Sequence, residues 1–164
     1  MVKEEVEVVV MEVSSQSLKL HRVDGCDFDI VIFTNFSEDH ISKIEHPDMQ
    51  DYLQSKLKLF KMCKNGIVNT DDLQGAKIPN LFPESNIMTY GIDNYAKLLA
   101  KDITITNSYV DFRVKIKAQN ERVKTGIPGR FSVYNSLAAI CVAQKFGVEP
   151  EIVKQALLEV RVPG

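Results

Sequence analysis

Two short apolar runs near the N-terminus, with a helical stretch between them, constrain the fold of this chain more than any other feature. The first run, residues 6–13, contains five valines and is too continuously apolar for a half-exposed strand. Such β-branched runs are typical of parallel strands covered on both faces. Ser14 or Ser15 is the expected N-cap of a helix through about Val23, and Asp29–Phe33 is the expected next strand. This order predicts a right-handed βαβ unit, in which ligands collect at the carboxyl ends of the strands.

The following residues continue the alternation of helices and strands. After the polar loop Glu38–Pro47, Asp48 is the expected N-cap of a helix, and apolar residues at helical spacing extend this helix to Phe60. Short apolar runs then predict strands at Gly66–Asn69 and Ile87–Tyr90.

Farther along, strict alternation of apolar and polar residues predicts an antiparallel hairpin. The alternation covers residues 103–105 and 110–116, and Asn107 and Ser108 supply a turn between them. One face of the hairpin is therefore expected to be solvated and the other buried.

Two helical patterns occupy the C-terminal part of the chain. The first runs from Ser132 to Phe146 and is ended by Gly147, and Pro150 opens a second through Val160. Together, these patterns indicate an α/β fold with a mostly parallel, doubly wound sheet and an antiparallel hairpin at its edge or in a small separate sheet.

Composition limits the class of protein. With 164 residues, of which 45% are hydrophobic and 26% charged, the chain has the composition of one soluble globular domain. No apolar run approaches the roughly 20 residues of a membrane span, and the N-terminus is acidic, which favours a cytoplasmic protein without membrane insertion. The three cysteines form no C-x-x-C pair, and the formal net charge of -2 comes with no basic stripe for nucleic acid.

Both ends of the chain suggest a longer protein. The first apolar run begins almost at once, and the sequence stops at Arg161–Gly164, directly after a helical pattern. Since proline and glycine at 163 and 164 are typical of a linker, we expect residues 1–164 to be a piece truncated at both ends.

Three side chains point to a cation site at one edge of the sheet. Glu12 ends a valine-rich strand, where a carboxylate is costly unless it is solvated or paired. His40 follows the neighbouring strand, and Lys56 lies on the apolar face of its helix, between Tyr52 and Phe60. Each residue also has a simpler interpretation: an acid at a strand end, a surface histidine, and a lysine whose ammonium reaches past the core to solvent. Their convergence favours the cation site.

Two common sites are disfavoured by missing glycines. Ser14, Ser15, Asp39 and His40 supply the residue types of a serine hydrolase, but no G-x-S-x-G turn is present. No G-x-x-x-x-G-K-[ST] phosphate loop occurs either, so the chain alone has no phosphate cradle.

Six motifs occur in the order found in the central, ATP-binding domain of the Mur ligases, which the whole chain resembles. They are MEVSSQSL, HRV, FTNFSEDH, DYLQSKLKLF, VNTDD and GRFSVYNSLAA. MEVSS with HRV favours the branch that adds the third residue of the peptidoglycan stem peptide. The other motifs are shared more widely, including with folylpolyglutamate synthetases.

The resemblance implies a metal and catalytic centre. Glu12, His40 and Lys56 would hold Mg²⁺, and His40 and Lys56 would be catalytic. Lys56 would be carbamylated by carbon dioxide, which replaces its ammonium with a carboxylate able to face a cation.

The resemblance also implies the ligands and the reaction. Ser14 and Arg22 would contact the UDP-sugar substrate, Asn135 would contact the adenine of ATP, and Asn69 and Asp72 lie in a motif beside the nucleotide. The parent enzyme would be an ATP-dependent amide-bond ligase acting on UDP-N-acetylmuramoyl-dipeptide and on diaminopimelate or lysine through an acyl phosphate. No nucleic acid and no obligate protein partner are expected.

Two departures from the family pattern limit the expected activity. Ser132 stands where the family usually has a second asparagine, three residues before Asn135, which removes reach toward the nucleotide. The family's phosphate loop would precede Met1 and its amino-acid-selecting domain would follow Gly164. We therefore expect the chain alone to be inactive and to bind ATP weakly. Two alternatives are a folylpolyglutamate-type ligase and a non-catalytic nucleotide-binding or interaction module.

Overall fold

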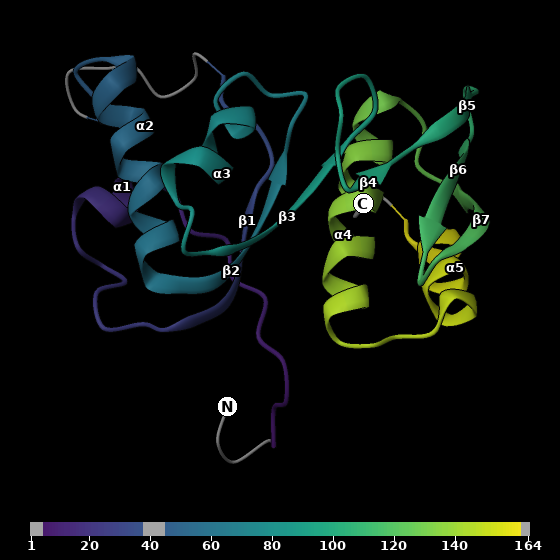
Figure 1. The fold of residues 1–164 in the computed structure, drawn as a ribbon, viewed down its shortest axis with the longest axis horizontal. Helices are drawn as coiled ribbons and strands as arrows, with labels where there is room; N and C mark the ends of the chain where they lie inside the picture. Colours follow the sequence, from purple (N-terminus) through teal and green to yellow (C-terminus); the bar gives the residue numbers. More distant parts are fainter. Residues whose placement is uncertain (1–4, 38–44, 162–164) are drawn as a thin grey trace. The chain divides into compact units, whose positions relative to one another are not determined.

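The structure, a computed structural model, describes residues 5–37 and 45–161 and forms two compact units (Figure 1). Of the described residues, 5–27 and 45–62 belong to the first unit, and 28–37 and 63–161 belong to the second. Within the described ranges, no helix has the length and apolar character needed to cross a membrane.

The first unit is built from two helices. Helix α1 spans Ser15–Lys19, and helix α2 spans Met49–Leu57 and continues as the 3-10 helix η2, Lys58–Met62. The two α-helices contact one another. Asp48 caps α2 as predicted, since its side chain accepts a hydrogen bond from the Asp51 amide. The helix after Ser14 is shorter than predicted and gives way to turns before Val23.

The predicted strand at residues 6–13 is wrong. The segment forms no strand, and its first four valines are exposed, with Val10 at 93%. A β-branched run favours extended backbone, but a strand also needs a neighbour that supplies hydrogen bonds. The described part of the first unit contains no other strand that could do so. The predicted first βαβ unit therefore does not form in this chain.

The second unit contains a four-stranded parallel sheet in the order β1-β2-β3-β4. The 3-10 helix η3 (Gly75–Lys77) and helix α3 (Ile78–Leu81) connect β2 to β3. The predicted strands at 29–33, 66–69 and 87–90 are confirmed, each one to three residues longer, while the two-residue β4 has no signal in the sequence. The strands are β1 (Phe28–Phe33), β2 (Cys63–Asn69), β3 (Asn86–Gly91) and β4 (Leu98–Leu99).

The same unit contains a separate antiparallel sheet in the order β5-β6-β7. The predicted hairpin is confirmed as β5 (Lys101–Ile105) and β6 (Val110–Ile116), and alternate residues of β6 are buried. The third strand, β7 (Gln119–Thr125), was not predicted because it is mostly polar. Its register is set by a tight turn in which Lys117 and Ala118 both have positive φ, and it pairs with β6 along its whole length.

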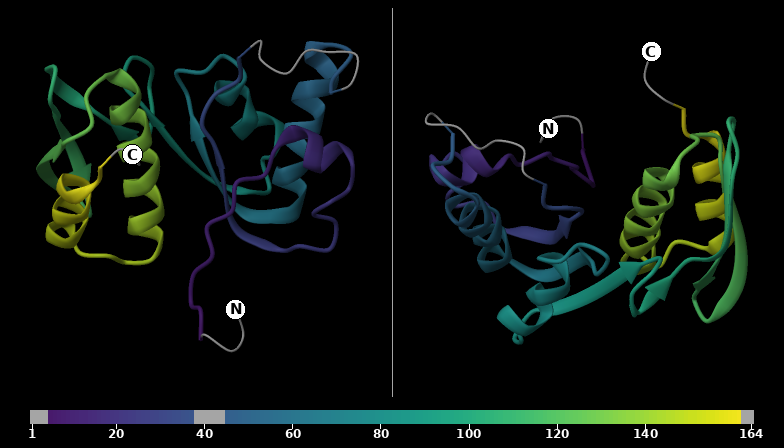
Figure 2. Two further views of the ribbon diagram at one scale, coloured as in Figure 1. Left: turned by 180° about the vertical axis from the view of Figure 1, so that it is seen from behind. Right: turned by 90° about the horizontal axis from the view of Figure 1, so that it is seen from above.

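Helices α4 (Arg130–Lys145) and α5 (Pro150–Glu159) complete the second unit, close to their predicted bounds. Helix α4 contacts β2 and β3 of the parallel sheet and β6 of the antiparallel sheet, while α5 packs on β7. Figure 2 shows α5, in yellow, against the green strands. A single apolar cluster joins α4 and α5 to both sheets, which confirms the α/β class.

Candidate functional site

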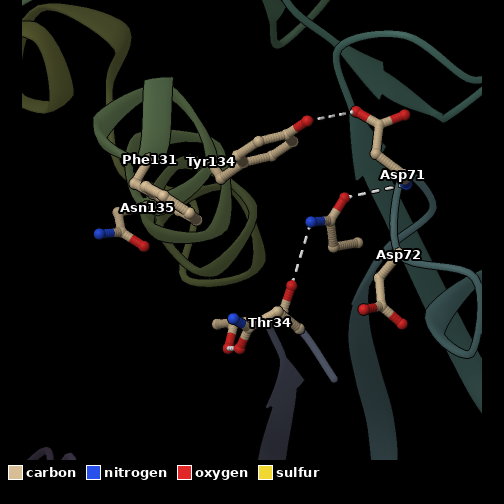
Figure 3. Close-up of a pocket in the computed structure, with 8 residues that line it drawn as sticks. Thr34, Asp71, Asp72, Phe131, Tyr134 and Asn135 are labelled. Atoms are coloured by element: carbon tan, nitrogen blue, oxygen red, sulfur yellow. Dashed lines mark hydrogen bonds between the residues drawn. The ribbon is translucent and has the colours of Figure 1, made fainter. Parts of the chain in front are cut away.

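A pocket of about 240 Å³, lined mostly by residues with polar side chains, lies in the second unit, where β1 and β2 end (Figure 3). This is the edge at which parallel α/β sheets collect their ligands. Loops after β1 and β2 supply one wall, and the first turns of α4 supply the other. The lining residues are Thr34, Asn35, Asn69, Asp71, Asp72, Phe131, Tyr134 and Asn135.

Asn69 joins the ends of the two strands. It is the last residue of β2 and is nearly buried, with 6% of its surface exposed. Its side-chain amide donates to the Thr34 carbonyl at 3.0 Å, and its side-chain oxygen accepts from the Asp71 amide at 3.0 Å. Because the amide nitrogen contacts the end of β1 and the amide oxygen contacts the loop after β2, Asn69 fixes this wall of the pocket.

Asp71 accepts hydrogen bonds from more groups than Asp72, the other carboxylate that lines the pocket. It accepts hydrogen bonds from the backbone amides of Ile92, Asp93 and Asn94, the shortest at 2.6 Å. It also accepts from the Tyr134 hydroxyl of α4 at 3.0 Å (Figure 3). One side chain therefore joins the loop after β2, the loop after β3 and helix α4.

The loop after Asp71 is held in place by a second carboxylate. Asp72 accepts from the Phe36 amide at 2.7 Å, beyond β1, and from the amides of Gln74 and Gly75. Gly75 is required by close approach, because a Cβ there would lie 2.1 Å from the Asn69 carbonyl oxygen. The Asp72 carboxylate therefore ties the loop between β2 and η3 to the segment after β1.

Helix α4 presents an aromatic ring and an amide to the pocket. Phe131 is 75% exposed, although it is a large apolar residue, and Asn135 is exposed one turn later. Between them, Ser132 is buried and donates to the Pro128 carbonyl at 3.0 Å. The Ser132 hydroxyl therefore binds the backbone just before α4, and the residue is not among those that line the pocket. This agrees with the expectation that a serine reaches less far toward the nucleotide than an asparagine.

Burial and local hydrogen bonds shift the pKa values of two groups of the pocket, Asp71 and Tyr134. Burial raises the pKa of Asp71, but the amides of Ile92, Asn94 and Asp93 and the Tyr134 hydroxyl outweigh it, so the net pKa is lowered. Asp71 is thus a stable carboxylate. Burial also raises the pKa of Tyr134, and its contact with Asp71 acts in the same direction, which keeps the phenol protonated.

The predicted substrate residues lie in the first unit, on α1 and its flanks. Ser14 is exposed and is the N-cap of α1, since its Oγ accepts from the Ser17 amide at 3.1 Å. This settles the choice between the two candidate capping serines. Glu12 precedes it in the extended segment and Arg22 follows in the turn after α1, and both are exposed. All three side chains are therefore open to a ligand.

Lys56 lies in the last turn of α2 and is half-buried. Its Nζ lies 5.0 Å from the centre of the Tyr52 ring, which is consistent with a cation–π contact. The predicted metal ligand His40 falls outside the described residues. Within the described ranges no cluster of three or more His, Cys, Asp or Glu side chains could hold a metal ion, so the predicted set of Glu12, His40 and Lys56 stays a prediction.

Sequence reasoning did not identify Asp71, Tyr134, Phe131 or His46 as parts of a site. Asp71 had a signal, because it follows the end of β2 beside Asn69, whereas its partner Tyr134 is 63 residues away. His46 is fully buried in the segment predicted to be an irregular polar loop. Its side-chain contacts exist only in the folded chain.

Known proteins match the chain over most or all of its length. The Mur ligase middle domain family matches residues 1–143. A UDP-N-acetylmuramoyl-L-alanyl-D-glutamate–2,6-diaminopimelate ligase from Caldanaerobacter subterraneus subsp. tengcongensis is 48% identical over 168 aligned residues, which cover 100% of this chain and 34% of the relative. The chain thus spans about a third of the curated relatives that it matches.

Solved structures of two ligases have a similar fold. A structure of a UDP-N-acetylmuramoyl-L-alanyl-D-glutamate–2,6-diaminopimelate ligase has a TM-score of 0.81 and 25% identity, over 93% of this chain and 32% of that chain. The MurF ligase from Thermotoga maritima in complex with ADP has the same fold, with a TM-score of 0.71 and 17% identity, over 93% of this chain and 35% of that one. This chain belongs to the Mur ligase family, whose middle domain is matched by its residues 1–143.

Proposed function

We propose that residues 1–164 are the middle-domain part of an ATP-dependent ligase that adds diaminopimelate to UDP-N-acetylmuramoyl-L-alanyl-D-glutamate in peptidoglycan synthesis. The observation that carries this proposal is the 48% identity, over the entire chain, to a ligase named for that reaction. Such relatives favour this substrate over a folylpolyglutamate substrate, and diaminopimelate over lysine. A reaction of nucleotide-linked precursors also favours a cytoplasmic enzyme.

The pocket in the second unit supports a role in ATP binding. Asn135 offers both a donor and an acceptor, which a purine edge requires, and the exposed Phe131 ring offers a surface for stacking. Asn69 and Asp72 hold the wall opposite α4. The MurF structure bound to ADP shows that this fold holds an adenine nucleotide in another family member.

The first unit supports a role in binding the UDP-sugar substrate. Ser14 presents a hydroxyl at the start of α1, and Arg22 presents an exposed guanidinium suited to phosphate oxygens. Glu12 and Lys56 would hold Mg²⁺ together with His40. An ammonium has no lone pair for a cation, so Lys56 fits this set only as its carbamate. Magnesium would supply charge neutralisation for phosphoryl transfer.

The reaction proposed for the parent enzyme has two steps. The substrate carboxylate attacks the γ-phosphorus of ATP, so that an acyl phosphate forms and ADP leaves. The amine of diaminopimelate then attacks the acyl carbon and loses a proton, the amide bond forms, and phosphate leaves. Substrate positioning by residues such as Ser14, Arg22 and Asn135 would lower the entropic part of the barrier.

A chimera tests the middle-domain part of this proposal, since the domain expected to select the amino acid would come from the Caldanaerobacter enzyme. Residues 1–164 would replace the matched third of the Caldanaerobacter ligase, with the remaining two thirds kept from that enzyme. We expect the chimera to form UDP-tripeptide from ATP and diaminopimelate, with one phosphate released per amide bond, and the Lys56→Ala chimera to lose this activity. A folded chimera that forms no product with diaminopimelate would refute the proposal. The unfused chain should show no ligase turnover.

A further inference from the structure

A chain of polar contacts centred on His46 links the two helices of the first unit. His46 is 0% exposed, its Nε2 lies 2.9 Å from the Ser15 Oγ, and its Nδ1 lies 2.7 Å from the Asp51 Oδ2. Lys19 donates to the same Asp51 oxygen at 2.7 Å and to the Glu45 carbonyl at 3.1 Å. We call this set, Ser15, His46, Asp51 and Lys19, the His46 relay.

The chemistry of the relay fixes the orientation of the imidazole. Hydrogen bonds from Lys19 and His46 lower the pKa of Asp51, so the Asp51 side chain is a carboxylate and can only accept. The Nδ1–H of His46 must therefore donate to it. Since Nε2 is used by Ser15, both ring nitrogens have partners, and the ring face stacks obliquely on Tyr52 with a centroid distance of 5.1 Å.

The same three residue types form the triad of serine hydrolases, but their burial argues against a nucleophile. Ser15 is 6% exposed and His46 is 0% exposed, so a substrate carbonyl has no route to the hydroxyl or to the ring. In addition, Lys19 forms an ion pair with the Asp51 oxygen that would have to stabilise an imidazolium. A structural link between helices accounts for all of these contacts.

The relay joins the two helices of the first unit that carry or adjoin residues with predicted ligand contacts. Ser15 is the first residue of α1 and is adjacent to the exposed N-cap Ser14, while Asp51 lies in the first turn of α2. Lys56 lies in the last turn of that helix. Because α1 has only five residues, its own hydrogen bonds hold it weakly, and its position depends on side-chain contacts such as these.

We propose that His46 is a positioning residue: the His46 relay holds the start of α1 against α2 so that Ser14 is placed for the UDP-sugar substrate. This inference rests on the proposed function only in its assignment of Ser14. No catalytic step involves the imidazole, which neither touches the substrate nor transfers a proton to it.

Two conservative variants separate the contact of His46 with Asp51 from its contact with Ser15. His46→Asn keeps a side-chain amide near the Nδ1 position and can still donate to Asp51, but it cannot reach Ser15. His46→Gln reaches toward Ser15 but gives up the short contact with Asp51. Ser15→Ala removes the hydroxyl alone. His21→Asn is the matched control, because His21 is exposed and has a positive φ, which asparagine tolerates.

Hydrogen exchange on the 164-residue chain tests the link itself. We expect His46→Asn to raise exchange of the Ser17 and Leu18 amides about tenfold, as expected for the loss of one net hydrogen bond, with β5–β7 unchanged. Ser15→Ala should have a similar effect, and the double variant should be no worse than the stronger single variant. Additive effects, or an equal effect from His21→Asn, would overturn the proposal.

Binding of UDP-N-acetylmuramoyl-L-alanyl-D-glutamate to the same chain tests the consequence. We expect the parent chain to bind it and His46→Asn and Ser15→Ala to bind it about tenfold more weakly, while both keep the fold of the second unit. Equal affinity of the parent and the variants would refute the positioning role. Absence of binding by the parent chain would instead contradict the assignment of Ser14 and Arg22, and the exchange experiment would still decide whether the relay links the helices.

Discussion

The two units each contain a carboxylate at the centre of a network, but the donors to these carboxylates differ in kind. Asp71 in the second unit accepts from three backbone amides and one phenol, all neutral groups. Asp51 in the first unit accepts from the ammonium of Lys19 and the imidazole of His46. Backbone donors fixed in a loop give a rigid pocket wall around Asp71. The side-chain donors to Asp51 instead give a link between helices that a single substitution or added salt can loosen.

The largest effect is expected when the acceptor of the backbone network is removed. Asp71→Ala leaves the amides of Ile92 and Asn94 and the Tyr134 hydroxyl without their partner, which should lower the free energy of unfolding by about 3 kcal/mol. Urea denaturation measures this loss. Asp93→Ala is the control, because it removes only an exposed ion pair with Arg130 and should cost less than about 1 kcal/mol. Equal losses would mean that Asp71 is not the centre of the pocket wall.

Next in size is the effect of crowding the same wall. Gly75→Ala places a Cβ 2.1 Å from the Asn69 carbonyl oxygen, so backbone must move, at a cost of about 2 kcal/mol. Gly91→Ala is a milder comparison, since its nearest contact is the Thr70 hydroxyl at 3.0 Å. Urea denaturation of both variants should rank Gly75→Ala as the more destabilised, and the reverse ranking would contradict the close approach that we describe.

A smaller loss is expected from one neutral hydrogen bond. Tyr134→Phe removes the hydroxyl that donates to Asp71, while three backbone donors remain, and should cost about 1 kcal/mol. Tyr95→Phe, at a residue that is 91% exposed, should change the free energy of unfolding by less than about 0.5 kcal/mol. If the two variants were equally stable, the contact between α4 and Asp71 would carry no net stability.

The smallest expected effect is a difference in how the stability conferred by the two networks depends on salt concentration and pH. Both carboxylates have pKa values lowered in the folded chain, so their stabilising contributions are present above the unfolded value of about 4 and are lost as the pH falls through the folded value. Asp71→Asn and Asp51→Asn should each flatten the decline in stability on acidification. At neutral pH, added salt should reduce the loss of unfolding free energy caused by Asp51→Asn, because Asp51 pairs with the Lys19 ammonium. The loss caused by Asp71→Asn should not change with salt, because the hydrogen-bond donors to Asp71 are neutral. Equal salt responses would remove the distinction.

The fold could be predicted where the local pattern and the tertiary environment agree. Phe28–Phe33 and Val110–Ile116 became strands because each buries apolar residues, such as Val31 and Phe112, and pairs with a neighbouring strand. The run at 6–13 has the stronger β-branched pattern but forms no strand, because pairing depends on a neighbour that sequence periodicity does not supply. Conversely, Gln119–Thr125 is polar and still pairs, because the turn at Lys117 and Ala118 directs it onto β6.

Candidate site residues could be predicted from the sequence only where they lie within a short sequence motif. Asn135, predicted to contact ATP, lines the pocket, and Ser14, predicted to contact the UDP-sugar, is exposed at the start of α1, while both ligand contacts stay predictions. The bond between Tyr134 and Asp71, and that between His46 and Ser15, join residues 63 and 31 positions apart. No spacing rule links such residues, so these contacts became visible only with the fold.

A two-ligand titration of the ¹⁵N-labelled 164-residue chain tests most directly whether the two units bind different ligands. ADP should shift the amide resonances of Asn69, Asp72 and Asn135, with weak affinity, and leave those of Ser14 and Arg22 in place. UDP-N-acetylmuramoyl-L-alanyl-D-glutamate should do the opposite. Shifts from ADP confined to the first unit, or an absence of shifts at the pocket up to millimolar ADP, would contradict the account.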